Sequence, residues 1–466
     1  TVAIVNVIPG GPSEAVGIIA GDRIVYVNDS LFVGTGVNEE KVFKNLRGKK
    51  DTKVKIDIRR GTSEDLLSFD VTRADVPVKT VPVSYMIDDK VGYIKVTKFG
   101  STTYNEFITA IAKLKSKGCE SFIVDLQQNT GGYMGATIMM SNEFLSSGDM
   151  IVYTEGRAYP RENVFADGTG TCKDNQLVVL VDEGSASASE ICAGAMQDND
   201  RGLIVGRRSF GKGLVQNRFV FKDGAAMQLT IARYHTPSGR CIQKAYKRGE
   251  RKDYDMDLLN RYNRGEFDSR DSIKFDNLPL FHTLGGRPVY GDDGILADVF
   301  IPRDTAGVTS YYLRVANSGM MREFAFVYTE NNREALTKYK TWEEASKYLS
   351  SQPLVDHLVE YAYQKGIRRQ PYLIQKSRRL LQTQLEAFVI RNLYGDDGFY
   401  PIFQRDDIII KEAIKLIKAN KATPAAIKEE RYKDSEGAKN LSENISANKL
   451  RLPFFVDDNQ FHNQVV

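Results

Sequence analysis

The sequence has no long hydrophobic run. Its longest apolar stretches, such as residues 177–181, are far shorter than the roughly 20 consecutive apolar residues that a membrane-spanning helix needs. We therefore predict no membrane-spanning helix within the 466 residues.

Cysteine is also scarce. The four cysteines, Cys119, Cys172, Cys192 and Cys241, lie far apart in the sequence and form no CxxC motif. This spacing excludes a zinc ribbon and a thioredoxin-like redox site, and it does not imply a disulfide framework. We predict no metal site and no cofactor.

Charge of one sign is not in excess. The 64 basic and 60 acidic residues leave a net charge of +4, so the chain carries no strong field for nucleic acid or an anionic membrane. Residues 246–276 are dense in charge, but acids balance bases there, which favours a solvated insertion or loop over a nucleic-acid patch. The hydrophobic fraction of 42% is typical of globular proteins, and the length predicts about two to four domains.

Residues 1–75 predict a small β-rich domain. A β-branched run opens the chain, a Pro-Gly-Gly-Pro turn follows at 9–12, and residues 54–60 alternate between apolar and polar. Between the strands, Val42 and Leu46 lie at helical spacing. The order of these elements, with the GDRI turn at 21–24, resembles a PDZ domain.

The PDZ resemblance implies a site for the C-terminus of a peptide. Val42 and Leu46 are candidates for contacting that peptide, with packing in the domain core as an equal alternative. The loop that binds the terminal carboxylate in PDZ domains would lie upstream of Thr1. Because the chain does not begin with a methionine, we expect this loop and any export signal to be missing from the sequence.

Residues 76–304 predict an α/β domain. Apolar strands at 122–126, 177–181 and 203–206 alternate with predicted helices, and the short connections predict right-handed parallel crossovers. Residues 226–232 alternate in polarity and predict an antiparallel strand.

Residues 305–466 predict a helical C-terminal region with a polar tail at 420–450. One apolar stripe is formed by Leu381, Leu385 and Phe388, and another by Ile410, Ile414 and Ile417. We expect these helices to pack on one another or on a partner, and a homo-oligomer formed through them is one such expectation. The predicted fold class is thus α/β multidomain.

The stretch 183–216 predicts a catalytic site. Ser187 follows a buried strand and lies at the first turn of a helix, where the helix dipole favours a developing oxyanion near Ala188. Lys212, between two glycines, follows the next parallel strand and should reach the same edge of the sheet. The Gly131-Gly132 pair follows a third strand and should reach that edge too.

A serine and a lysine can form a catalytic pair. The serine hydroxyl is a weak nucleophile until a base removes its proton, and a lysine is that base only when it is neutral. Burial favours the neutral amine. Gln216, four residues after Lys212, could orient the amine without favouring its charged form.

These motifs together resemble the PDZ-bearing, carboxy-terminal processing branch of the S41 peptidase family. The resemblance rests on GSASASE at 184–190, FGKG at 210–213, the Asn129-Thr130-Gly131-Gly132 segment and HTPSGRCIQ at 235–243. It implies a ClpP/crotonase-like protease domain and a location in the bacterial envelope or periplasm. The implied substrates are proteins with apolar C-termini.

The resemblance also implies a role for each site residue. Ser187 matches the nucleophile, Lys212 the general base and Gln216 the third member of the triad. Ala188 matches one amide of the oxyanion hole, and either Gly131 or Gly132 the other. The family's usual Arg and Pro are absent from the glycine loop, which reads LQQNTGG at 126–132. Ser185 and Ser189 are the expected helix caps.

Two alternatives compete with this interpretation. A Ser–His–Asp hydrolase would need one of the four histidines, His235, His282, His357 or His462, as its base, and His235 and His282 are more often structural in such contexts. A PDZ scaffold on a peptidase fold would be expected to lack Ser187 or Lys212, and the sequence retains both.

Overall fold

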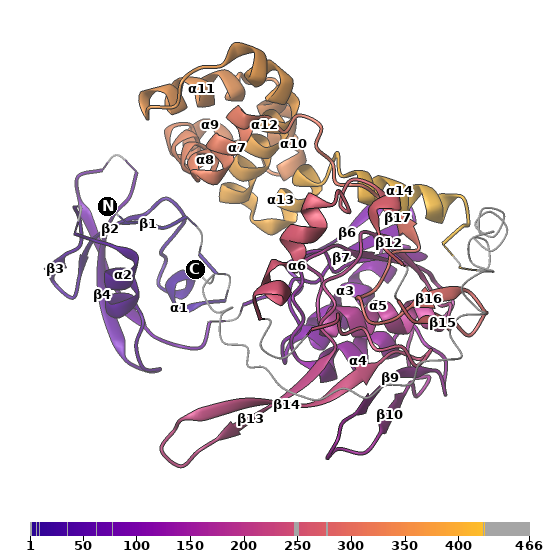
Figure 1. The fold of residues 1–466 in the computed structure, drawn as a ribbon. Coiled ribbons are helices and arrows are strands. Elements are labelled where there is room, and N and C mark those ends of the chain that lie inside the picture. The colour runs from indigo at the N-terminus through magenta and orange to yellow at the C-terminus, as the bar shows by residue number, and fades with distance from the viewer. Residues whose placement is uncertain are drawn as a thin grey trace. The chain divides into compact units, whose positions relative to one another are not determined.

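The computed structural model describes residues 2–422 and 424, except positions 6, 9, 35, 62, 77, 247–250, 276 and 277 and the side chains of 251–253 and 255. Most of the predicted polar tail and His462 therefore lie outside the described residues. The chain divides into two compact units, one of residues 1–79 with 305–406, the other of residues 80–304 with the segment from Asp407. Figure 1 shows the elements of both units.

The first unit begins with a small antiparallel sheet of order β1-β2-β4-β5, with β3 paired to β2. Alternating residues of β4, such as Val54, Ile56 and Ile58, are buried, as the polarity pattern predicts. The elements are β1 (Val2–Ala3), α1 (Pro12–Ala15), β2 (Arg23–Val27), β3 (Ser30–Leu31), α2 (Glu39–Leu46), β4 (Lys53–Arg59) and β5 (Leu66–Thr72).

Helices form the rest of the first unit. Leu381 and Leu385 of the predicted stripe are fully buried in a core that these helices share. These two residues are therefore covered within one chain. The homo-oligomer expected through these helices stays a prediction. The helices are α7 (Ser310–Asn317), α8 (Met320–Asn331), α9 (Arg333–Leu336), α10 (Trp342–Ser350), α11 (Leu354–Gln364), α12 (Pro371–Tyr394) and α13 (Asp396–Phe403).

The second unit confirms the α/β prediction. Its main sheet has the order β17-β12-β11-β8-β7-β6, in which β7, β8, β11, β12 and β17 run parallel. Helices α3, α4 and α5 belong to the core on one face. The elements are β6 (Val83–Asp88), β7 (Val91–Lys95), α3 (Thr103–Lys115), β8 (Ser121–Asp125), α4 (Met134–Asn142), β11 (Gln176–Val181), α5 (Ala188–Asp198), β12 (Leu203–Gly206) and β17 (Val299–Phe300).

The last helix, α14 (Ile408–Lys418), packs on β11 and β12 of this sheet. Its apolar face includes Ile410 and Ile417, which are buried. The expected helical region 305–466 is therefore divided between the units. The reason is physical: both faces of a parallel sheet are apolar and need a cover.

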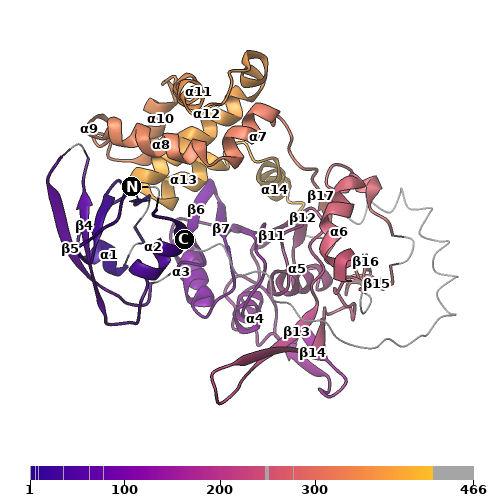
Figure 2. The same cartoon turned by 60° about the vertical axis from the view of Figure 1, so that its left-hand side comes forward.

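A second, antiparallel sheet has the order β10-β9-β14-β13. Its strands are β9 (Met150–Glu155), β10 (Glu162–Phe165), β13 (Leu214–Val220) and β14 (Ala226–His235), so the predicted antiparallel strand at 226–232 is present. Figures 1 and 2 both show the β13–β14 hairpin extending beyond the rest of this sheet.

The charged insertion contains a helix, α6 (Arg251–Asn263), followed by a 3-10 turn at Arg270–Ser272, β15 (Leu280–His282) and β16 (Pro288–Tyr290). The expectation of a solvated loop is wrong for α6, since Arg261 is 1% exposed and donates to Glu266 at 2.9 Å. Some of the charged residues at 246–276 therefore pair with one another in the interior, as Arg261 and Glu266 do. The composition of the segment does not show which charges are buried. Among the described helices, none is both long and apolar enough to cross a membrane.

Candidate active site

Three parallel strands bring the predicted residues to one edge of the main sheet. β8, β11 and β12 are hydrogen-bonded neighbours in parallel register. The segments that follow them carry Gly131, Ser187 and Lys212, respectively. Because the carboxyl ends of parallel strands meet at one edge, these segments converge there.

Ser187 lies at a strained turn between β11 and α5. It is the N-cap of α5, with φ 56° and ψ −114°, in the left-handed region that a non-glycine residue adopts only when its surroundings enforce it. Its side chain is half-buried. The turn therefore presents one serine at the positive end of a helix.

Ser185 and Ser189 do not cap the helix, so that expectation is wrong. Both are fully buried, and their hydroxyls donate to the Leu126 and Asn129 carbonyl oxygens at 2.8 Å. These bonds tie the turn to the neighbouring loop. Of the three serines, only Ser187 has a partly exposed side chain.

A buried carboxylate joins the Ser187 turn to the Lys212 loop. Glu190 Oε2 accepts the backbone N–H of Ser187 at 2.8 Å and that of Lys212 at 2.8 Å. The two backbone nitrogens therefore share one carboxylate oxygen. Glu190 Oε1 accepts from Gly211 N at 2.7 Å and from Ser209 Oγ. The structure thus places Ser187 and Lys212 side by side.

The sequence prediction did not include Glu190. It occupies the third position of α5, and the Ser-x-x-Glu spacing from Ser187 is a capping-box pattern that could have identified it. Burial raises the pKa of the Glu190 carboxyl, and its four hydrogen-bond donors offset part of that effect. A carboxylate next to the lysine also differs from the neutral surroundings that we expected for Lys212.

The Lys212 loop is held at both flanking glycines. Lys244 N donates to the Gly211 carbonyl at 2.9 Å, and Gly213 N donates to Gln243 Oε1 at 2.9 Å. A Cβ at Gly213 would lie 2.7 Å from Gln243 N, so the loop packs too closely on this segment for a larger residue. Lys212 itself is half-buried.

Gln216 lies on β13, where the pairing with β14 shifts register between Val215 and Gln216. Its side-chain oxygen accepts a hydrogen bond from Gln228 Nε2 on β14 at 2.7 Å. In this structure the Gln216 side-chain oxygen is therefore bound to Gln228, and the predicted contact with the Lys212 amine would have to replace or share that hydrogen bond.

The glycine pair lies against the serine turn. Gly131 has φ +96°, and a Cβ there would lie 2.7 Å from Ser187 Cβ and 2.7 Å from Ala186 O. Its N–H donates to Asn129 Oδ1 at 2.9 Å. Among the described residues, the N–H groups of Gly132 and Ala188 have no hydrogen-bond acceptor.

Asn129 organises this loop; the sequence marked it as part of a motif but gave it no role of its own. It is fully buried, donates from Nδ2 to Val96 O at 2.9 Å, and accepts Ala186 N on its carbonyl at 3.0 Å. In the same loop, Gln128 has φ 59°, and its N and Nε2 donate to Asp182 at 2.8 and 2.6 Å. Side-chain amides therefore hold the loop in this chain.

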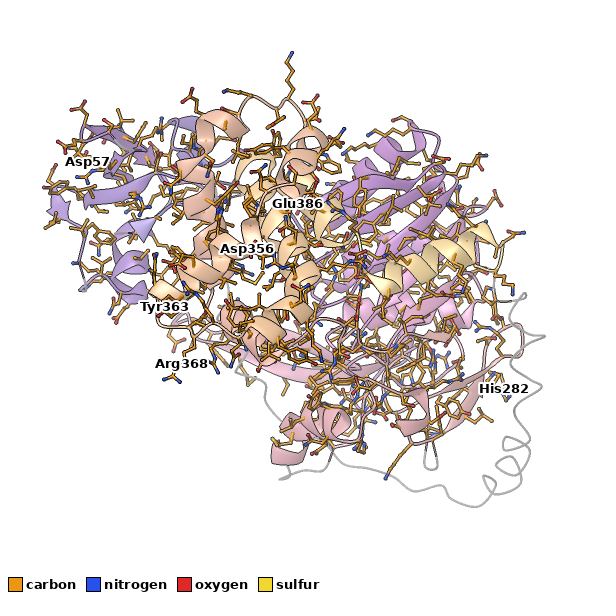
Figure 3. All side chains as sticks on the ribbon, turned by 90° about the horizontal axis from the view of Figure 1, so that it is seen from above. Asp57, His282, Asp356, Tyr363, Arg368 and Glu386 are labelled. Carbon is orange, nitrogen blue, oxygen red and sulfur yellow. The ribbon has the colours of Figure 1, made fainter. Side chains whose placement is uncertain are left out.

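The histidines take structural positions. His235 stacks on Tyr153, with ring centroids 4.6 Å apart and 3° between the planes, and its Nδ1 lies 3.2 Å from Gly239 O. Burial lowers the pKa of His235. His282 is exposed on β15, and Figure 3 shows it at the rim of its unit. His357 is exposed on α11. This arrangement favours the structural interpretation for His235, whereas His282 and His357 lie exposed on their elements.

Val42 and Leu46 of the first unit are half-buried on α2 and pack against the core of the small sheet. Core packing, the alternative to peptide contact, accounts for both residues. Within the part of the chain that is described, no group of three or more His, Cys, Asp or Glu side chains could hold a metal ion. The four cysteines are buried free thiols.

Comparison with protein families finds two matches. Residues 90–255 match the family described as Peptidase family S41, and residues 311–395 match a family of unknown function. The first match contains every residue placed at the site above.

Individual relatives are similar over half of the chain. A carboxyl-terminal-processing protease of Synechocystis sp. is 37% identical over 240 residues, which cover 50% of this chain and 55% of that protein. The carboxy-terminal processing protease CtpA of Bacillus subtilis is 37% identical over 247 residues, covering 52% and 51%. The chain thus spans about half the length of the curated relatives it matches. A solved structure, the photosystem II D1 C-terminal processing protease, is 30% identical, with a TM-score of 0.33, over 52% of this chain and 65% of that one.

Proposed function

We propose, on the premise that residues 90–255 are a peptidase family S41 region, that this chain is a serine endopeptidase with Ser187 as nucleophile and Lys212 as general base. One observation carries the proposal: Glu190 Oε2 binds the backbone of both residues at 2.8 Å. A serine at a helix N-terminus next to a lysine has the two groups that acyl transfer needs.

The reaction follows from these positions. Ser187 Oγ attacks the scissile carbonyl carbon as its proton passes to the neutral Lys212 amine. The N–H groups of Ala188 and Gly132 bind the oxyanion, and each such donor contributes about 3–4 kcal/mol to transition-state binding. Lys212 then protonates the leaving amine. The same lysine activates the water that hydrolyses the acyl-enzyme.

The substrates are proteins captured by their apolar C-termini through the PDZ-like residues 1–75. This part of the proposal rests on the resemblance of residues 1–75 to a PDZ domain. It also requires that the Ser187 site accept an unfolded chain. A location in the bacterial envelope or periplasm and self-association stay predictions.

The test compares the full chain with Ser187→Ala on an unfolded protein that ends in either apolar or charged residues, with products read by mass spectrometry. We expect cleavage by the wild-type chain alone, and faster cleavage of the substrate with the apolar end. Equal rates on both substrates would remove the capture step. Absence of cleavage, with equal peptide binding by both proteins, would favour the scaffold alternative.

A second test separates lysine from histidine as the base. We expect His235→Gln to keep the rate of cleavage within about threefold, and Lys212→Met to lower it at least about a hundredfold. The rate should rise towards alkaline pH, because the amine acts only when it is neutral. With its pKa lowered by burial, His235 would instead give a rate that no longer rises above neutral pH. Such a plateau, or activity of Lys212→Met, would contradict the assignment.

A further inference from the structure

A buried arginine of the charged insertion binds the segment that leads into the Lys212 loop. Arg261 lies on α6 and is fully buried. Its Nη1 donates to the Ser209 carbonyl oxygen at 2.9 Å, and its Nη2 donates to the Arg208 carbonyl oxygen at 2.8 Å. One guanidinium group therefore holds two consecutive carbonyls just ahead of Lys212.

These two carbonyls belong to a segment without regular secondary structure. The segment lies between β12, which ends at Gly206, and β13, which begins at Leu214. Among the described residues, no backbone N–H donates to the carbonyl of Arg208 or Ser209. A buried carbonyl outside a helix or sheet needs a donor from elsewhere. Arg261 supplies that donor for both.

Glu266 fixes the orientation of the Arg261 side chain. It is 2% exposed and accepts hydrogen bonds from Arg261 Nε at 2.9 Å and from Arg208 Nε and Nη2 at 2.7 and 2.6 Å. Burial raises the pKa of the Glu266 carboxyl, but the hydrogen bonds and charges of the two arginines outweigh burial and lower that pKa overall. The carboxylate is therefore charged. With Nε held, the planar guanidinium presents Nη1 and Nη2 to the backbone in one orientation.

The segment that Arg261 holds is linked to the proposed reacting groups. Ser209 Oγ donates to Glu190 Oε1, and Glu190 Oε2 accepts the backbone N–H groups of Ser187 and Lys212. A rotation of the Ser209 peptide would turn its hydroxyl away from Glu190. Arg261 can therefore affect the geometry of the Ser187–Lys212 pair although it binds neither residue in this structure.

We propose that Arg261 is a positioning residue for the reaction: by holding the two carbonyls it keeps the Ser209 hydroxyl on Glu190, and Glu190 then places the Lys212 backbone. The inference rests on the proposed function. Arg261 lies beyond residues 90–255, the part of the chain that matches the peptidase family, so the family match assigns it no role. Its effect is on geometry alone, because it transfers no proton.

The chain offers a matched control in the same unit. Arg201 is half-buried, and its guanidinium also donates to backbone carbonyls: Nε to Phe144 O, and Nη2 to Cys172 O and Asn175 O, each at 2.7 Å. Arg201 follows the end of α5 that lies opposite Ser187. Arg201→Met therefore removes hydrogen bonds of the same kind and leaves every contact at the Ser187 site in place.

The experiment uses the full chain as wild type, Arg261→Met, Arg261→Lys, Arg201→Met and Ser187→Ala. We would measure kcat and KM on a fluorescently labelled unfolded protein, well below the melting temperature of each variant, and thermal unfolding in parallel. Methionine keeps an apolar stem of similar length, and Glu266 keeps Arg208 as its partner, so the substitution leaves no carboxylate unpaired.

For Arg261→Met we expect kcat at least about tenfold lower and KM within about twofold, since the alignment of the reacting groups changes and substrate binding does not. Arg261→Lys keeps the charge but lacks the planar fork, so its kcat should fall by at least about threefold. For Arg201→Met we expect both constants unchanged, whatever its loss of stability.

Three results would overturn the inference while leaving the proposed function intact. The first is a wild-type kcat in Arg261→Met or, where that variant does not fold, in Arg261→Lys. The second is an equal loss of kcat in Arg261→Met and Arg201→Met that follows their melting temperatures. The third is failure of both Arg261 variants to fold, which would make the residue a purely structural one. If the wild-type chain cleaves no faster than Ser187→Ala, the proposed function fails, and the inference fails with it.

Discussion

Glu190→Ala is expected to remove peptidase activity and to destabilise the second unit by at least about 4 kcal/mol. The substitution leaves four donors without their acceptor: the N–H groups of Ser187, Gly211 and Lys212 and the Ser209 hydroxyl. Each buried donor without a partner costs about 1–3 kcal/mol. The link between Ser187 and Lys212 is lost as well, and misplacement by about 1 Å can lower a rate a hundredfold.

The measurement pairs thermal unfolding with the rate of cleavage of an unfolded protein. Glu143→Ala is the control, because Glu143 is 4% exposed and accepts hydrogen bonds from Tyr104 Oη at 2.7 Å and from Thr171 N at 3.0 Å. It should lose comparable stability and keep its activity at temperatures well below its melting point. A Glu190→Ala protein that cleaves at the wild-type rate would refute the role of the shared carboxylate.

Gly131→Ala is expected to lower kcat at least about a hundredfold. Its Cβ would lie 2.7 Å from the Ser187 Cβ and from Ala186 O, and 2.9 Å from the Ala188 nitrogen. Most of these atoms belong to the backbone and cannot shift without a change in the turn. The Ser187 turn and the Ala188 N–H must therefore move to make room for the new methyl group. The backbone at φ +96° adds strain for any side chain.

Gly148→Ala is the control that introduces backbone strain without a steric clash. Gly148 has φ +88°, and a Cβ there meets nothing within 4 Å. This variant should therefore lose only about 1 kcal/mol of stability, with unchanged kcat. Similar kcat values for Gly131→Ala and Gly148→Ala would show that the close approach of Gly131 to Ser187 is unimportant for the reaction.

The parallel pairing of the strands and the convergence of the segments that follow them could be predicted because they depend on local pattern. Apolar runs such as 122–126 and 177–181 form β8 and β11, and short helical connections leave parallel pairing as the favoured solution. The convergence of the Ser187 and Lys212 segments follows from that topology.

The choice among three serines could not be predicted from residue pattern. Ser185, Ser187 and Ser189 have the same type of neighbours, and only burial distinguishes them. Two of their hydroxyls are committed to carbonyl oxygens of the loop after β8, which is 59 or 60 residues away in the chain. Such long-range partners leave no local signal.

The oxyanion donor is a similar case. The sequence left Gly131 and Gly132 as equal alternatives, since both follow β8 and both permit an unusual backbone. The structure separates them because the Asn129 side chain folds back onto the Gly131 N–H. This hydrogen bond is the reason why the proposal places the Gly132 N–H, and not that of Gly131, in the oxyanion hole.

The sequence by itself determined an α/β unit with a serine and a lysine at one sheet edge, because periodicity and connection length control which elements form and how they pair. Only the tertiary structure decided the rest: α14 as cover for the sheet, and Glu190 as the link between the backbones of Ser187 and Lys212. These depend on which buried polar groups meet across distant segments. Most buried donors have an acceptor in a folded protein, and which acceptor each one meets is decided only when distant segments pack together.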